Sequence, residues 1–122
     1  MTEERLLLGK WGEDQAAKYL RKKRFQIVER NFTCPLGEID IIAREKDRLI
    51  FVEVKTKALH DHLLPRYSVN PRKQRQIIRV ARYYLKGTGN SNVRCRFDVV
   101  EIIAGPGKHP EKIVHLPGAF RA

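Results

Sequence analysis

The feature that most constrains the fold is a pair of segments rich in isoleucine and valine, 39–44 and 49–56, separated only by a short charged stretch around Glu45-Lys46-Asp47. β-Branched residues favour strands, and a connection this short joins antiparallel neighbours. The two segments therefore predict a tight β-hairpin, and any fold of this chain must place these two strands side by side.

Helical patterns lie on both sides of the predicted hairpin. From about residue 4 to residue 23, apolar side chains recur at intervals of three and four residues. Asn70-Pro71 supplies a helix cap and a first-turn proline for a second helix, which runs to about Lys86 and stops at Gly87. Further strands are expected at 25–31, 93–103 and 112–116. The order αβββαββ predicts one α/β domain over residues 1–122, a mixed central sheet flanked by helices.

Charged side chains interrupt both strands of the predicted hairpin. Asp40 lies inside the first strand, while Glu53 and Lys55 project from one face of the second, because strand side chains repeat every two residues. Two adjacent carboxylates repel unless a cation lies between them. Mg²⁺ or Mn²⁺ takes carboxylate oxygens and keeps waters for a phosphate substrate. The residues alone leave open a half-buried salt bridge between Lys55 and one carboxylate.

A third carboxylate belongs to the first predicted helix. Glu13 lies on the helical row of Ala16, Ala17 and Leu20, which points toward the sheet. A lone helical glutamate is ordinarily solvated, but on an apolar row it needs a partner, and a metal site would supply one. The candidate catalytic residues are Glu13, Asp40, Glu53 and Lys55.

The charge of the chain indicates a polyanionic partner. Its 25 Lys and Arg residues against 14 Asp and Glu residues give a net charge of +11, which favours phosphate binding through counterion release. Basic residues recur along the second helix without intervening acids, which predicts a surface that follows a nucleic-acid backbone, with Arg94 and Arg96 extending it. The candidate nucleic-acid-binding residues are Arg72, Lys73, Arg75, Arg79, Arg82 and Lys86.

A membrane partner is not expected. No apolar run approaches the ~20 residues of a membrane span, and no strongly amphipathic anchoring helix carries Trp and Phe on its apolar face. The N-terminus lacks a signal-peptide core, so the expected location is the cytoplasm, where Cys34 and Cys95 would stay reduced.

Five phrases in order carry a resemblance to a known family. They are Gly12-Glu13, Gly37-Glu38-Ile39-Asp40-Ile41-Ile42-Ala43-Arg44, Phe51-Val52-Glu53-Val54-Lys55-Thr56, Asn70-Pro71-Arg72-Lys73-Gln74 and Arg96-Phe97-Asp98-Val99-Val100. Over about residues 9–103 they resemble the YraN family of bacterial proteins. Asp40 followed by Glu53-Val54-Lys55 resembles the PD-(D/E)XK motif of restriction-endonuclease-like and Holliday-junction-resolvase-like nucleases.

The resemblance implies a restriction-endonuclease-like domain that hydrolyses phosphodiester bonds in DNA, branched or structured DNA included, with Mg²⁺ or Mn²⁺. It implies Asp40, Glu53 and the Val54 carbonyl as metal ligands, Lys55 as the catalytic lysine, and Glu13 as the first-helix carboxylate of resolvase-like members. Those members often act as dimers, so fold-level analogy offers a homodimer as one alternative, but nothing in the sequence marks a dimer face and the oligomeric state stays open. The chain departs from the pattern in two places, since no proline directly precedes Asp40 and residues 58–69 lack the family's glycine-containing loop.

Three functions stay open at the level of sequence. The first is a nuclease, with DNA expected over RNA as its substrate. The second is a module of the same fold that binds DNA or RNA without cutting. The third is a basic RNA-associated protein whose carboxylates only pair with lysines. Asp98 is expected to pair with Arg96, with which it shares a strand face, and His60 and His62 are interpreted as polar loop surface.

Overall fold

The computed structural model describes residues 3–58, 69–107 and 109–122, so most of the predicted loop, with His60 and His62, lies outside the described residues. The elements are α1 (Glu3–Lys22), β1 (Gln26–Cys34), β2 (Gly37–Glu45), β3 (Arg48–Ala58), α2 (Pro71–Gly87), β4 (Arg94–Ala104) and β5 (Pro110–Phe120). The predicted α/β class and the order αβββαββ are confirmed.

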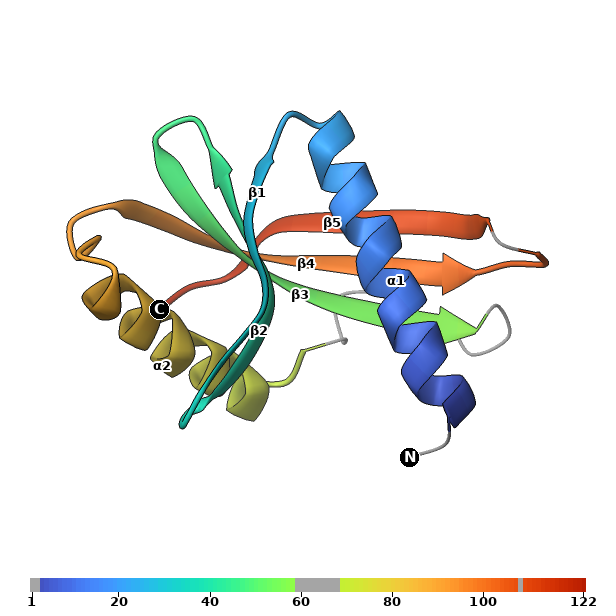
Figure 1. The fold of residues 1–122 in the computed structure, drawn as a ribbon, viewed down its shortest axis with the longest axis horizontal. Helices are drawn as coiled ribbons and strands as arrows, with labels where there is room; N and C mark the ends of the chain where they lie inside the picture. The colour runs from blue at the N-terminus through green and yellow to red at the C-terminus, as the bar shows by residue number, and fades with distance from the viewer. Residues whose placement is uncertain (1–2, 59–68, 108) are drawn as a thin grey trace.

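The strands form one mixed sheet in the order β1-β2-β3-β4-β5 (Figure 1). The pair β3–β4 is parallel, and the other pairs are antiparallel. The parallel pair follows from the α2 crossover between its two strands. The predicted β2–β3 hairpin is confirmed, with its turn at Lys46 and Asp47 and a left-handed φ of 56° at Lys46. This hairpin places Asp40 and Glu53 on neighbouring strands.

The two helices cover opposite faces of the sheet. Side chains alternate along β3, so Ile50 and Val52 pack in a cluster with Leu20 of α1, whereas Phe51 packs in a second cluster with Ile77 of α2. In Figure 1, α1 crosses β3 and β4, and α2 lies beside the β1–β2 hairpin. No helix in the described part of the chain is long and apolar enough to cross a membrane.

The last strand is longer than predicted. β5 extends from Pro110 to Phe120 instead of ending at Leu116, although Pro117-Gly118 usually marks the end of a strand. Proline is tolerated here because β5 is an edge strand. Gly118 adopts a left-handed φ of 59° and donates its N–H to the Asp98 carboxylate at 3.0 Å. The buried Asp98 side chain thus binds the Gly118 N–H in place of a backbone partner in the β-ladder.

The end of α2 also differs slightly from its prediction. Gly87 is the last helical residue and does not stop the helix itself. Thr88 caps the helix by donating both its N–H, at 3.0 Å, and its hydroxyl, at 2.8 Å, to the Tyr84 carbonyl. The left-handed glycine is Gly89, with φ 73°.

Candidate active site

The β2–β3 ladder ends where the predicted site begins. The backbone pair farthest from the hairpin turn is Ile41 with Val52. One residue further, the Asp40 carboxylate accepts the backbone N–H of Val54 at 2.8 Å. The N–H and C=O of a strand residue point to the same side, so the Val54 carbonyl is directed toward β2 as well. A carboxylate and a main-chain carbonyl therefore meet where the two strands separate.

Asp40 and Glu53 form a carboxyl pair. The Glu53 side chain is only 7% exposed. Its burial, together with the negative charge of Asp40 and a hydrogen bond between the two carboxyl groups, raises the pKa of Glu53 to about 8, although the ammonium groups of Lys73 and Lys55 oppose this shift. At neutral pH Glu53 therefore holds a proton beside Asp40. A divalent cation can take the place of that proton between the oxygens.

Two ammonium groups flank Glu53. The Nζ atoms of Lys55 and Lys73 each lie 3.9 Å from Oε2 of Glu53. Lys55 comes from the same face of β3, as predicted. Lys73 comes from the first turn of α2, where Asn70 caps the helix by accepting the Lys73 N–H at 2.9 Å. From the sequence, Lys73 is both a candidate for the basic surface and, because it lies near the helix start, a residue that could face the cleft. The structure places its Nζ beside the carboxyl pair.

Glu13 lies close to the pair on α1. The helical row that continues from it is fully buried against the sheet, as predicted: Ala16, Ala17 and Leu20. Partial burial and the nearby Asp40 carboxylate raise the pKa of Glu13, while a hydrogen bond with Asn31 and the charge of Arg30 lower it. Within the described residues, no three acidic, histidine or cysteine side chains are gathered closely enough to hold a metal together. Glu13 is thus a neighbour of Asp40 and does not form a three-carboxylate cluster with the pair.

Gly12 determines how closely α1 approaches β3. A Cβ on Gly12 would overlap Oγ1 of Thr56 and lie 2.9 Å from the Thr56 Cβ. Carbon atoms do not pack this closely, so at this helix position only glycine fits without a shift. The close approach holds Glu13 beside β3, which gives the phrase Gly12-Glu13 a steric basis that the sequence did not reveal.

Among the hollows that open beside residues of this site, one lies near the end of β3 and another near the start of α2. The first, of about 460 Å³, lies between α1 and the end of β3 and is lined by Leu8, Gly9, Glu13, Val54, Lys55, Thr56, Lys57 and Ala58. The second, of about 430 Å³, lies at the start of α2 and is lined by Asn70, Arg72, Lys73, Gln76 and Arg79. The first hollow is thus bordered by two of the predicted catalytic residues, Glu13 and Lys55, and the second by three of the predicted nucleic-acid-binding residues, Arg72, Lys73 and Arg79.

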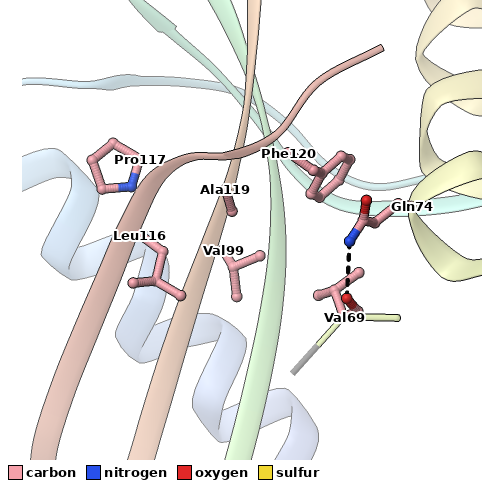
Figure 2. Close-up of a pocket in the computed structure, with 7 residues that line it drawn as sticks. All are labelled: Val69, Gln74, Val99, Leu116, Pro117, Ala119 and Phe120. Atoms are coloured by element: carbon pink, nitrogen blue, oxygen red, sulfur yellow. Dashed lines mark hydrogen bonds between the residues drawn. The ribbon is translucent and has the colours of Figure 1, made fainter. Parts of the chain in front are cut away.

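A third pocket, of about 270 Å³, has different chemistry. Figure 2 shows it lined by Val69, Gln74, Val99, Leu116, Pro117, Ala119 and Phe120. Its one polar side chain, Gln74, donates a hydrogen bond to the Val69 carbonyl at 3.1 Å. This lining offers no titratable group, so the pocket is not a candidate for hydrolysis although it is the more enclosed one.

Most of the predicted basic surface lies where the sequence placed it. Five side chains along α2 are exposed, and none of them forms an ion pair within the described residues: Arg72, Arg75, Arg79, Arg82 and Lys86. Lys73 is the exception, because it lies at Glu53. The predicted extension by Arg96 is wrong, since Arg96 is only 20% exposed and pairs with Asp98.

Asp98 is a structural anchor beneath β5. Its fully buried carboxylate accepts two hydrogen bonds from Arg96, at 2.8 and 2.9 Å, and one from the Gly118 N–H, and it lies 2.7 Å from Nε2 of His115. Burial alone would raise the pKa of Asp98, but the contacts with His115, Arg96 and Gly118 lower it overall. The predicted pairing with Arg96 is confirmed, and the contact with His115 was not foreseen.

The fold and this site define an α/β protein whose mixed sheet carries a partly buried carboxyl pair, with two lysines beside its glutamate, at the end of a hairpin. The family described as "Uncharacterised protein family UPF0102" matches residues 12–102, so the chain belongs to the UPF0102 family. This is the YraN family of the predicted resemblance.

Similar proteins cover nearly the whole chain. The UPF0102 protein of Syntrophotalea carbinolica is 48% identical over 120 residues, which is 98% of this chain and 96% of the relative. That of Desulfosudis oleivorans is 45% identical over 113 residues, 93% of this chain and 91% of the relative. That of Caldanaerobacter subterraneus subsp. tengcongensis is 40% identical over 114 residues, 93% of each chain. These matches establish the family and name no activity.

Proposed function

We propose that this chain is a Mg²⁺- or Mn²⁺-dependent nuclease that hydrolyses phosphodiester bonds in DNA. The observation that carries the proposal is the pairing of Asp40 with the buried Glu53, with Lys55 beside it. Two carboxyl groups in contact raise the free energy of the protein unless a proton or a cation lies between them. A pair held in this way, with Val54 and Lys55 of the next positions lining a hollow, is suited to binding a cation.

The oxygen donors fit a hard divalent cation. Asp40 and Glu53 offer carboxylate oxygens, the Val54 carbonyl is directed to the same side, and water and substrate oxygens would complete the coordination. Bound there, the metal would lower the pKa of a water and offset the charge of the phosphate. Glu13, close to Asp40, would accept a hydrogen bond from a water beside these donors.

Lys55 would stabilise the reacting phosphate. In hydrolysis, the oxygen of water forms a bond to phosphorus, the bond from phosphorus to the leaving sugar oxygen breaks, the water gives up a proton, and the leaving oxygen gains one. The ammonium group of Lys55 would orient the attacking water and offset the negative charge that develops on the phosphate oxygens. Its distance of 3.9 Å from Glu53 keeps it within reach of the same phosphate.

The exposed basic face of α2 would bind the substrate backbone. Its arginines contact phosphates without reading sequence, so they would fix the position of DNA on the surface and make binding sensitive to salt. We place branched or otherwise structured DNA first among substrates, DNA before RNA, and the protein in the cytoplasm as a homodimer. The choice of branched DNA and of a dimer follows resolvase-like nucleases by analogy.

The rival function is a module of the same fold that binds nucleic acid without cutting it. The basic face of α2 alone supports this second function. A cleavage assay separates the two. It would use Mg²⁺ and Mn²⁺ with linear, nicked, flapped and four-way-junction DNA and an RNA hairpin. We expect metal-dependent cutting that is lost in Glu53→Ala and Lys55→Ala but kept in Asp47→Asn, a control on a carboxylate that is 75% exposed. Salt-sensitive binding without cutting would support the rival.

Metal binding can be measured without a substrate. At a metal concentration ten times the Kd, stabilisation is about 1.4 kcal/mol, which raises Tm by roughly 4–8 °C in a domain of this size. We expect this shift in the wild type and in Asp47→Asn, and its loss in Glu53→Ala. An equal shift in all three proteins would refute the metal site.

A further inference from the structure

We propose that Lys73 is a second catalytic lysine, which contacts the reacting phosphate, so that the first turn of α2 belongs to the active site as well as to the DNA-binding surface. This inference rests on the proposed nuclease function and adds a residue from a separate element, 18 positions beyond Lys55 in the chain.

Lys73 differs from the other basic residues of α2 in its environment. Its side chain is 33% exposed, whereas the adjacent Arg72 and the nearby Arg75 are exposed to solvent. Its Nζ lies 3.9 Å from Oε2 of Glu53, the same distance as the Nζ of Lys55. A direct hydrogen bond between an ammonium and a carboxylate is about 2.7–2.9 Å long. Within the described residues, the contact of the Lys73 Nζ with Glu53 is therefore an ion pair longer than a direct hydrogen bond.

The helix start fixes the direction from which Lys73 reaches the site. The Asn70 side chain accepts the backbone N–H of Lys73 at 2.9 Å, and Gln74 bonds back to the Val69 carbonyl at 3.1 Å. Lys73 also lines the hollow of about 430 Å³ that it shares with Arg72 and Arg79. Lys73 therefore lies between a concave basic surface and the carboxyl pair. A nucleic-acid backbone bound on that surface would pass Lys73 on its way to the carboxyl pair.

The two lysines approach Glu53 from different elements, Lys55 from β3 and Lys73 from α2. A phosphodiester has two non-bridging oxygens, and both gain negative charge as water attacks. When a cation occupies the carboxyl pair, the charge of Glu53 is taken up, and the ammonium group of Lys73 can turn to one of these oxygens. It makes and breaks no covalent bond, and it stabilises charge that is greatest in the transition state.

Steady-state cleavage by matched lysine variants tests the inference, on the substrate that the wild type cuts and at saturating metal. We expect Lys73→Ala to lower kcat roughly 100-fold, with KM changed much less, and Lys73→Arg to recover part of the loss. Lys86→Ala, at the far end of α2, removes a backbone contact and should mainly raise KM. Lys18→Ala, an exposed lysine on α1, is the control that should leave both constants unchanged.

Three outcomes would overturn the inference. If Lys73→Ala resembles Lys86→Ala, Lys73 is an ordinary backbone contact: the inference fails and the nuclease stands. If the wild type cuts no substrate, the proposed function fails and the inference falls with it. The metal-induced rise in Tm should persist in Lys73→Ala, because Asp40 and Glu53 remain. Loss of that rise together with kcat would mean that Lys73 only supports the carboxyl pair, which also overturns the inference.

Discussion

The close approach of α1 to β3 gives a prediction with a built-in control. α1 contains two glycines in its interior, Gly9 and Gly12. A Cβ on Gly9 would have no atom within 4 Å, whereas a Cβ on Gly12 would overlap the Thr56 hydroxyl and lie 2.9 Å from the Thr56 Cβ. The same substitution, glycine to alanine, therefore meets open space at one position and a packed strand at the other.

The expected magnitudes follow from these two environments. Alanine is better than glycine in a helix interior by about 0.8–1.0 kcal/mol, so Gly9→Ala should raise the free energy of unfolding by about that amount. Gly12→Ala gains the same helix propensity but forces an overlap, and overpacking costs about 1–3 kcal/mol. Rotation of the Thr56 side chain cannot relieve the contact with its Cβ. We expect Gly12→Ala to be about 0–2 kcal/mol less stable than the wild type.

Denaturant unfolding of both variants, followed by circular dichroism, measures the difference. We expect the two free energies of unfolding to differ by about 1–3 kcal/mol, and Thr56→Gly, which removes the obstructing side chain, to reduce that difference in the double variant. Gly12→Ala should also lose nuclease activity beyond its loss of folded protein, because Glu13 moves with the helix. Equal stabilisation by the two alanines would refute the close contact between α1 and β3.

Further predictions concern charge. Asp98→Asn should lower the free energy of unfolding by about 3 kcal/mol at neutral pH, since it leaves Arg96 without its buried carboxylate. Because the folded-state pKa of Asp98 is lowered, this difference from the wild type should persist above pH ~4 and shrink as pH falls below it. Acid titration of Tm would measure it. The folded-state pKa of Glu53 is raised to about 8. Without metal, the free energy of unfolding should therefore fall as pH rises from ~5 to 8, by at most about 1.4 kcal/mol per pH unit. Denaturant unfolding should show a smaller pH dependence in Glu53→Gln. Replacing Arg79 by alanine should weaken DNA binding on every sequence and lower the slope of log K against log salt by about one, measured by fluorescence anisotropy.

The order of elements could be predicted because local signals agree with the final fold. The turn at Lys46-Asp47 and the cap at Asn70 mark their elements without help from distant residues. The alternation along β3 likewise foretold that Glu53 and Lys55 share a face opposite Ile50 and Val52. Signals of this kind lie within a few residues of the feature that they specify.

The parts that could not be predicted depend on contacts between distant segments. Lys73 approaches Glu53 from 20 residues away in the chain. Its place near the start of α2 indicates that it could face the cleft, but not that its ammonium group lies beside Glu53. The extension of β5 past Pro117 depends on Asp98, whose buried carboxylate binds the Gly118 N–H. The strand tolerates Pro117 and Gly118 because this carboxylate, on the neighbouring strand β4, binds the backbone. No local sequence pattern indicates that contact.

The charges at the site suggest why cation and substrate would bind together. Asp40 and Glu53, when ionised, carry two negative charges, and the ammonium groups of Lys55 and Lys73 carry two positive ones, so the four groups cancel. Without a metal, the proton on Glu53 leaves an excess of one positive charge that a solvent anion can balance. A divalent cation held by the two carboxylates in place of that proton would add two positive charges, which a phosphodiester and a hydroxide together would balance. Removing either lysine should therefore weaken the site most in the state that holds metal, phosphate and hydroxide together, which is the state that leads to hydrolysis.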